Sequence, residues 1–213
     1  MSDYKKAFIE LAIGCNVLRF GEFKTKAGRL SPYFFNAGLF NNGNALRQLG
    51  QFYAKAIIAA QLPFDMLFGP AYKGIPLVST IAIALAELGY NYPFCFNRKE
   101  LKDHGEGGIT IGAPLSGRVL IADDVISAGT SIGESVNLIR AESATPCGVI
   151  IALDRLEQGS NKLSAVQEVN NLHHIPVISI IDLNDIVDYL KEATNMRQNL
   201  QAIQAYRERY GTQ

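Results

Sequence analysis

The chain has 213 residues, enough for one substantial hydrophobic core, and 48% of them are hydrophobic. Its 20 basic and 20 acidic residues cancel, which excludes a general electrostatic attraction to nucleic acid, and the isoelectric point is about 6.8. Only 19% of the residues are charged, below the usual ~25%, so we expect part of the surface to be buried in an oligomer.

No stretch of the sequence predicts a secretion signal or a membrane span. The N-terminal ten residues lack a long apolar run. The most apolar stretch, residues 75–86, is about twelve residues long, short of the ~20 needed to cross a bilayer. Cys15, Cys95 and Cys147 are scattered and match neither a zinc-binding spacing nor a disulfide framework. These features predict a cytoplasmic protein with no membrane partner.

The first 40 residues are expected to contribute a helix and a hood to a single domain spanning residues 1–213. Apolar residues recur at helical spacing over residues 3–19. Residues 21–36 alternate short extended pieces with Gly28 and Pro32, which is typical of a β-hairpin. On the residues alone, the basic and aromatic side chains there could simply be a solvated turn beside hydrophobic anchors.

Helices and short strands then alternate, beginning with a helix capped by Asn44 that runs to about residue 60. A short buried strand follows at residues 65–69, and the Pro- and Gly-containing segment 70–76 predicts a tight loop before the next helix. Lys73 in this loop would lie at the carboxyl end of a strand, where it could meet an anionic ligand. Such loops also commonly do no more than connect two elements.

Residues 91–97 predict a strand, and the segment 98–108, R-K-E-L-K-D-H-G-E-G-G, follows it. This segment combines four cationic side chains with three glycines and has no apolar period, so we expect an exposed, mobile loop. A charge run of this kind is usually only a solvated loop. The functional alternative is a lid that closes its cations over a bound polyanion and excludes water.

The most informative stretch is 118–134, R-V-L-I-A-D-D-V-I-S-A-G-T-S-I-G-E. Residues 119–122 predict a strand buried on both faces that ends in Asp123 and Asp124, and residues 132–141 predict a helix. The turn 127–131 offers N–H groups and hydroxyls at a helix N-terminus, which suits a phosphate. The acid pair suits hydrated Mg²⁺ or a vicinal diol, so together they indicate a ribose 5-phosphate. An Asx turn with a helix cap is the simpler alternative.

Strand 147–153 is followed directly by Asp154 and Arg155. A guanidinium at this edge suits a carboxylate or carbonyl group, although an ion pair with Asp154 or Glu157 is the alternative. The rest of the chain predicts a helix over 161–171, a strand over 175–181, and helices over 182–193 and about 195–209. The alternation predicts an α/β fold with a doubly wound, mainly parallel sheet flanked by helices.

The acid pair followed by S-A-G-T-S resembles the 5-phosphoribosyl 1-pyrophosphate (PRPP) motif of type I phosphoribosyltransferases. Four further segments occur in family order: K-T-K-A-G-R-L-S-P-Y-F-F-N, G-P-A-Y-K-G-I-P, F-N-R-K-E-L-K-D-H-G-E-G-G and A-L-D-R-L-E. From about residue 20 to residue 157 the chain is therefore similar to the orotate phosphoribosyltransferase family. A purine phosphoribosyltransferase would share 123–131 but not the hood and lid segments. A PRPP-binding regulator would need a basic face or a nucleic-acid module.

The resemblance implies transfer of phosphoribosyl from PRPP to orotate, giving orotidine 5′-monophosphate and pyrophosphate in UMP biosynthesis. It also implies Mg²⁺, held mainly through PRPP and water near the acid pair, and a homodimer that shares lid 98–108 across its interface. The implied PRPP-binding residues are Lys26, Tyr72, Lys73, Arg98, Lys99, Lys102, His104, Asp123, Asp124, Val125, Ile126, Ser127, Ala128, Gly129, Thr130 and Ser131. The implied orotate-binding residues are Phe34, Phe35, Ser127 and Arg155, and the implied catalytic residues are Lys102, Arg98, His104, Asp123 and Asp124.

Overall fold

The structure, a computed structural model, describes residues 2–25, 28–102, 108–127, 129–159, 162–193 and 195–212, without the side chains of residues 101 and 102. Its centre is a six-stranded sheet with the strand order β5-β4-β3-β6-β7-β8. The strands are β3 (Met66–Gly69), β4 (Phe94–Lys102), β5 (Gly108–Gly112), β6 (Arg118–Ala122), β7 (Thr145–Asp154) and β8 (Val177–Asp182). All neighbours pair in parallel except β4 and β5, which confirms the doubly wound, mainly parallel sheet.

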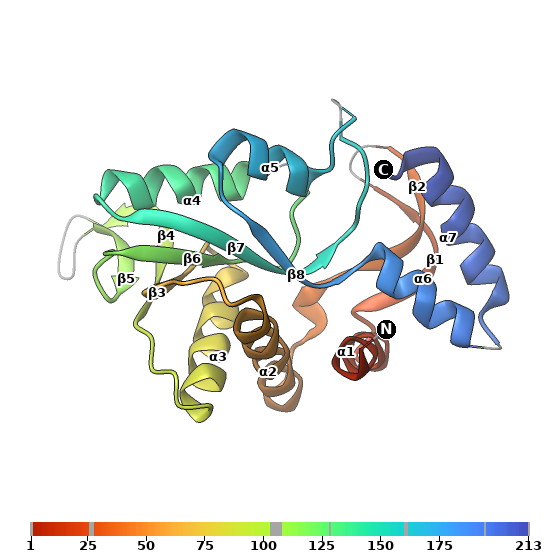
Figure 1. The fold of residues 1–213 in the computed structure, drawn as a ribbon, viewed down its shortest axis with the longest axis horizontal. Coiled ribbons are helices and arrows are strands. Elements are labelled where there is room, and N and C mark those ends of the chain that lie inside the picture. Colours follow the sequence, from red (N-terminus) through yellow and green to blue (C-terminus); the bar gives the residue numbers. More distant parts are fainter. Residues whose placement is uncertain are drawn as a thin grey trace.

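Helices cover both faces of this sheet (Figure 1): α2 (Gly43–Ala60) and α3 (Gly74–Glu87) lie on one face, and α4 (Thr130–Ala141) and α5 (Ala165–His173) lie on the other. Adjacent strand residues point to opposite faces of the sheet, so each strand contributes side chains to two hydrophobic cores. Leu120 packs in the cluster with the residues of α2 and α3, whereas Ile121 packs with those of α4 and α5. Burial on both faces explains why these strands are continuous apolar runs.

The predicted hood is a two-stranded antiparallel hairpin of β1 (Leu18–Lys24) and β2 (Leu30–Phe35), preceded by α1 (Asp3–Gly14) and followed by the short helix η1 (Ala37–Leu39). Two C-terminal helices, α6 (Leu183–Glu192) and α7 (Arg197–Tyr210), pack on this end of the molecule. Figure 1 shows α7 alongside the hairpin, so the two ends of the chain enclose the hood together.

Several predicted boundaries are wrong, each for a local reason. The N-terminal helix stops at Gly14 because the chain turns there to start β1 at Leu18. Asn42, not Asn44, caps α2, since its side chain accepts a hydrogen bond of 3.0 Å from the Ala45 amide. The helix predicted over 161–171 begins only at Ala165, after a capping box formed by Ser164 and Gln167.

The expectation of a loop over 98–108 is wrong at both ends. Residues 98–102 continue β4, and β5, which the sequence did not predict, begins at residue 108. The two strands pair antiparallel, with Asn97 opposite Thr110 and Lys102 opposite Gly108. This pairing is made by backbone hydrogen bonds and does not require apolar residues at regular spacing. The charged sequence therefore did not predict it. Residues 103–107 lie outside the described part of the chain.

Among the residues that the structure describes, no helix is both long enough and apolar enough to cross a membrane.

Candidate functional site

The sheet reverses its winding between β3 and β6. From β3 the chain proceeds to β4 on one side, and from β6 it proceeds to β7 on the other. The loops after these two strands therefore open a crevice at the carboxyl edge of the sheet, where ligands of open α/β sheets bind. We call the region between loop 70–73 after β3 and the segment after β6 the crevice, and Arg155 follows the neighbouring strand β7 at the same edge.

The acid pair stands at the floor of the crevice. Asp123 and Asp124 are only 8% and 7% exposed. The Asp124 amide donates to Oδ1 of Asp123 at 2.8 Å, and the hydroxyl of buried Tyr53 donates to the Asp123 carbonyl at 2.9 Å. Burial first, and the neighbouring Asp124 carboxylate second, raise the pKa of Asp123 to about 7. The pair is thus a buried set of carboxyl oxygens with a perturbed pKa, which makes it a candidate functional site.

Lys73 meets this pair from the other loop. Its Nζ lies 2.8 Å from Oδ2 of Asp124, while its side chain stays 57% exposed. The loop that carries it is tight: a Cβ added to Gly74 would lie 2.7 Å from the carbonyl carbon of Gly69. Asn97 of β4 anchors the loop, since its Oδ1 accepts a 2.7 Å hydrogen bond from the Ala71 amide. The loop therefore presents a cation at a defined position with its head group in solvent.

The turn before α4 has the form that an anion site needs. Gly129 takes a left-handed conformation with φ of 70° and serves as the N-cap, and Ser127, Thr130 and Ser131 are exposed around it. Gly129 has no side chain that could cap the first turn of α4, and the N–H groups of a helix N-terminus suit an anion. The preceding residues anchor the turn: Ile126 is buried in the core cluster under α4, and Val125 packs against the opposite one. Ala128 lies outside the described residues.

The described residues of the segment predicted to be a lid lie near the same loop. Lys99 is exposed on β4, and its Nζ lies 5.4 Å from the ring centroid of Tyr72, which is 66% exposed. This is a cation–π contact between two of the predicted PRPP-binding residues. Arg98 is half-buried one residue earlier on the strand. The side chain of Lys102, and both His104 and Lys26, lie outside the described residues.

The two hood phenylalanines do not share a face. Phe34 is 38% exposed and stacks on Phe23 with ring centroids 5.5 Å apart, and Arg19 lies 5.5 Å from the Phe34 centroid. Phe35 is 7% exposed and belongs to the main core. Alternation along β2 forces this difference, because neighbouring strand residues point to opposite sides. Only Phe34 is available to contact a ligand with its ring.

Arg155 is held by two side chains from the hood and by Glu157, which follows it in the chain. Its Nη2 donates to Glu157 Oε1 at 2.5 Å and to Ser31 Oγ at 3.2 Å. Its guanidinium carbon lies 4.4 Å from the ring centroid of Tyr33, whose hydroxyl donates to the same Glu157 oxygen at 3.1 Å. The ion pair with Glu157, which the sequence left open, is therefore present, but it is mostly buried and not a surface pair.

The sequence did not indicate Asn97, Tyr53 or Ser31 as parts of the site, and it indicated Glu157 only as an alternative ion-pair partner of Arg155. Asn97 could have been predicted from its position, because it is an amide side chain at the carboxyl end of the predicted strand 91–97. Tyr53 reads as an ordinary inward-facing helix residue, and its contact to Asp123 crosses 70 positions in the chain. Nothing local indicates such a contact.

Within the described residues, no group of three or more His, Cys, Asp or Glu side chains could hold a metal ion by itself. The acid pair offers two carboxylates at most. That donor set fits Mg²⁺ that takes its remaining oxygen ligands from a phosphorylated substrate and water, a common arrangement for this ion.

Comparison of the sequence and the structure with known proteins identifies the family to which the chain is similar. Residues 38–180 match the family described as Phosphoribosyl transferase domain. The orotate phosphoribosyltransferase of Nitrosospira multiformis is 71% identical over 212 residues, covering 100% of this chain and 93% of that protein. That of Thiobacillus denitrificans is 63% identical, covering 99% and 100%. The crystal structure of the Francisella tularensis orotate phosphoribosyltransferase matches with a TM-score of 0.88 at 41% identity, covering 97% of this chain and 100% of that one.

Proposed function

The chain belongs to the orotate phosphoribosyltransferase family, and on that premise we propose how its residues transfer the phosphoribosyl group of PRPP to orotate. The products are orotidine 5′-monophosphate and pyrophosphate, in pyrimidine biosynthesis. The observation that carries the proposal is the meeting of Lys73 with the buried pair Asp123–Asp124 at the switch point of the sheet. This contact places the ammonium group of Lys73, which could bind pyrophosphate, beside the carboxyl groups that could accept hydrogen bonds from the ribose hydroxyls.

PRPP would lie along the crevice. Its 5′-phosphate would accept hydrogen bonds from turn 127–131 at the start of α4, and its ribose hydroxyls would donate to Asp123 and Asp124. Its pyrophosphate would meet Lys73 and Tyr72, with Arg98, Lys99, Lys102 and His104 closing from the lid. Two anionic groups at opposite ends and a diol between them match this order of donors, acceptors and cations.

The physical demand of the reaction is charge separation. Breaking the bond between C1′ and the pyrophosphate oxygen leaves positive charge on the ribose and adds negative charge to the leaving group. Cations held in place before the reaction stabilise that developing charge most effectively, because they need no reorganisation. Lys73 is positioned by a tight loop and by its ion pair, which suits this role. We assign the largest contribution among the lid residues to Lys102.

Mg²⁺ is part of the proposal. Asp123 and Asp124 would lie near it, and the pyrophosphate and water would supply most of its ligands. When bound, the ion would offset negative charge on the leaving group.

Orotate would lie between the hood and Arg155. Phe34 can offer the exposed face of its ring to the base, Phe35 would act only by anchoring β2 in the core, and Ser127 would lie at the phosphate end. Arg155 would pair with the planar carboxylate of orotate. The ring nitrogen of orotate is an acidic imide-type nucleophile, so the reaction needs no dedicated strong base.

We further propose a cytoplasmic homodimer in which residues 1–213 form one domain and lid 98–108 reaches the partner's crevice. The first test is the loss of orotate absorbance with orotate, PRPP and Mg²⁺, for the wild type and Lys102→Ala. Turnover by the wild type, with a rate that falls a hundredfold or more in the variant, would support orotate as the substrate and the proposed role of Lys102 in the lid. Turnover with hypoxanthine, adenine or uracil in place of orotate would overturn the assignment of the base.

Mixing two inactive variants tests the shared lid. A Lys102→Ala subunit and an Asp124→Asn subunit would form a hybrid dimer with both lesions in one site and an intact second site. About a quarter of wild-type activity should return after random reassociation of a one-to-one mixture. If the lid serves its own subunit, each site keeps one lesion and no activity returns.

A further inference from the structure

We propose that Glu157 is a positioning residue for Arg155, and that the C-terminal tail holds Glu157 in place. Residues 210–212, which we call the tail, would thereby control how firmly the base is bound. This inference rests on the proposed role of Arg155 in binding orotate, and it adds a residue that has no contact with the base in that proposal.

The first observation is the direction of the hydrogen bonds. Within the described part of the chain, both hydrogen bonds of Arg155 leave from Nη2, one to Glu157 and one to Ser31. The ring of Tyr33 lies against the guanidinium, with its centroid 4.4 Å from the central carbon. One corner of the planar group is thus fixed from three sides, and these contacts leave the Nη1 group as a donor for the carboxylate of the base.

The second observation is that Glu157 is itself fixed. The Tyr33 hydroxyl donates to the same Oε1 that accepts from Arg155, at 3.1 Å. The Glu157 side chain is only 16% exposed, so a charge without partners there would be costly. The ring of Tyr206, from α7, packs edge-on against Tyr33 with centroids 6.5 Å apart and closes the cluster from behind.

The third observation is how the tail engages this segment. Glu157 forms an isolated β-bridge with Gly211. On either side of it, the Gln158 amide donates to the Tyr210 carbonyl at 2.7 Å, and the Thr212 amide donates to the Leu156 carbonyl at 2.8 Å. The tail therefore runs beside residues 156–158 as a short extra strand, and it sets where the Glu157 backbone lies.

The hood adds a cross-link to the same segment. Arg29, just before β2, donates from Nη1 to the Gln158 carbonyl at 2.8 Å. Its guanidinium carbon lies 4.8 Å from the ring centroid of Tyr210. The hood, the tail and residues 155–158 therefore contact one another, although they come from three distant parts of the chain.

A rival role for Glu157 makes the opposite prediction. If its carboxylate only weakened the positive potential at Arg155, removing it would tighten the binding of anionic orotate. If it positions Arg155, removing it releases the guanidinium and weakens binding. Glu157→Ala distinguishes the two by the sign of the change. Glu157→Gln keeps an acceptor oxygen and loses the charge, so positioning predicts that it restores much of the affinity.

The experiment measures KM for orotate and for PRPP separately, with the melting temperature of each variant. We expect Glu157→Ala to raise KM for orotate about tenfold or more and to leave KM for PRPP within about twofold, with partial recovery in Glu157→Gln. Tyr33→Phe keeps the ring and loses the hydroxyl, so it should raise KM for orotate by a few-fold, and it remains informative if Glu157→Ala does not fold.

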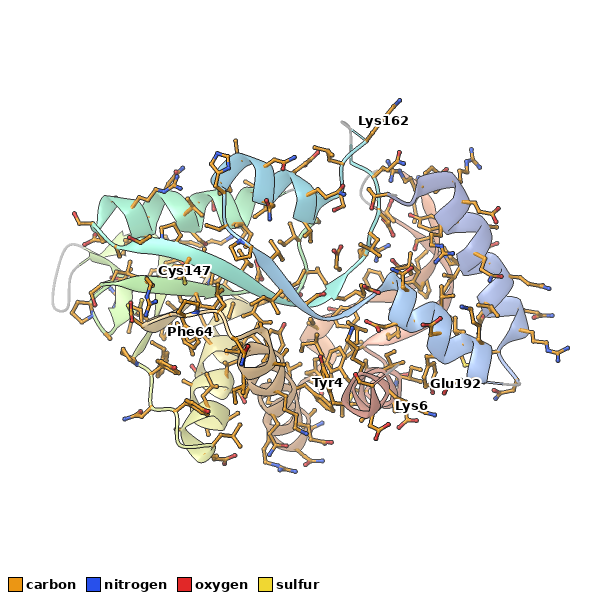
Figure 2. All side chains as sticks on the ribbon, in the orientation of Figure 1. Tyr4, Lys6, Phe64, Cys147, Lys162 and Glu192 are labelled. Carbon is orange, nitrogen blue, oxygen red and sulfur yellow. The ribbon has the colours of Figure 1, made fainter. Side chains whose placement is uncertain are left out.

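The matched control is Glu192→Ala. This glutamate pairs with Lys6 at 3.0 Å on the surface where α1 meets α6, and Figure 2 labels both residues there. Neither kinetic constant should change in this variant. An effect equal to that of Glu157→Ala would reduce the inference to a general loss of stability and overturn it.

A double-mutant cycle decides whether Glu157 acts through Arg155. With Arg155→Ala already present, Glu157→Ala should change KM for orotate by less than about twofold. Equal effects in both backgrounds, or tighter binding in Glu157→Ala, would overturn the inference alone. An Arg155→Ala variant with unchanged KM for orotate would instead overturn the proposed role of Arg155, and a wild type without orotate turnover would overturn the proposed function.

Discussion

The Nζ atom of Lys73 lies 2.8 Å from Oδ2 of Asp124, joining the loop after β3 to the acid pair after β6. The lysine balances part of the charge of the buried pair, and its exposed head group remains accessible to an incoming anion. One side chain thus connects the two halves of the crevice, the half suited to pyrophosphate and the half suited to the ribose.

Replacing Lys73 by alanine should lower kcat/KM for PRPP by roughly 10²–10³, because it removes a cation aimed at the leaving group. Steady-state kinetics at saturating orotate would measure this. Lys191→Ala is the control, since Lys191 makes a comparable 2.8 Å ion pair with Asp188 on the exposed surface of α6. A kcat/KM for PRPP within threefold of the wild type would remove Lys73 from the mechanism.

The raised pKa of Asp123 predicts a stability that falls as pH rises. The folded protein holds this proton up to about pH 7, whereas the unfolded chain releases it near the ordinary value of 3.8. The free energy of unfolding should therefore decrease between about pH 4 and pH 7 through this group and then level off. The neutral variant Asp123→Asn should lack this contribution.

Denaturant unfolding of the wild type and Asp123→Asn at pH 5 and pH 8 would measure the difference. We expect the variant to be more stable than the wild type at pH 8, by no more than a few kcal/mol, and the gap to shrink at pH 5. It should also lose most of its activity, because the acceptor for the ribose hydroxyl is weakened. A gap that widens toward low pH would contradict the assigned shift.

Asn97→Ala should disturb the loop of Lys73 without touching a substrate in the proposed arrangement. The Ala71 amide would lose its 2.7 Å acceptor, so the loop would no longer be held in one conformation. We expect KM for PRPP to rise about tenfold and KM for orotate to stay unchanged. Asn44→Ala, which removes a surface contact to Arg47 on α2, is the comparison. Equal changes for both substrates would indicate general destabilisation.

Truncation after Tyr210 removes most of the tail that pairs with residues 156–158. KM for orotate should rise several-fold while KM for PRPP stays close to the wild-type value, because Glu157 loses its backbone support. Removing Gln213 alone is the control and should have no effect. A truncated protein with wild-type kinetics would show that the side-chain cluster holds Arg155 without the tail.

Much of the fold was predictable because its signals are local. Strands such as β6 are apolar on both faces, and this marks them in the sequence as buried elements of a parallel sheet. The acid pair, the small turn and the following helix are contiguous, so their order alone indicated a sugar phosphate. The hood hairpin was also visible, through its alternating pattern and Gly28.

The tertiary structure alone decided which neighbours these elements would meet. It turned Phe35 into the core and Phe34 toward solvent, paired β5 with the end of the charge run, and placed Asn97 under the loop of Lys73. It also brought Glu157 to Tyr33, which lies 124 positions away. Helical and strand periodicity reports only which face of an element is buried. Hydrogen bonds between distant side chains depend on how those faces pack together, and the local sequence carries no record of that.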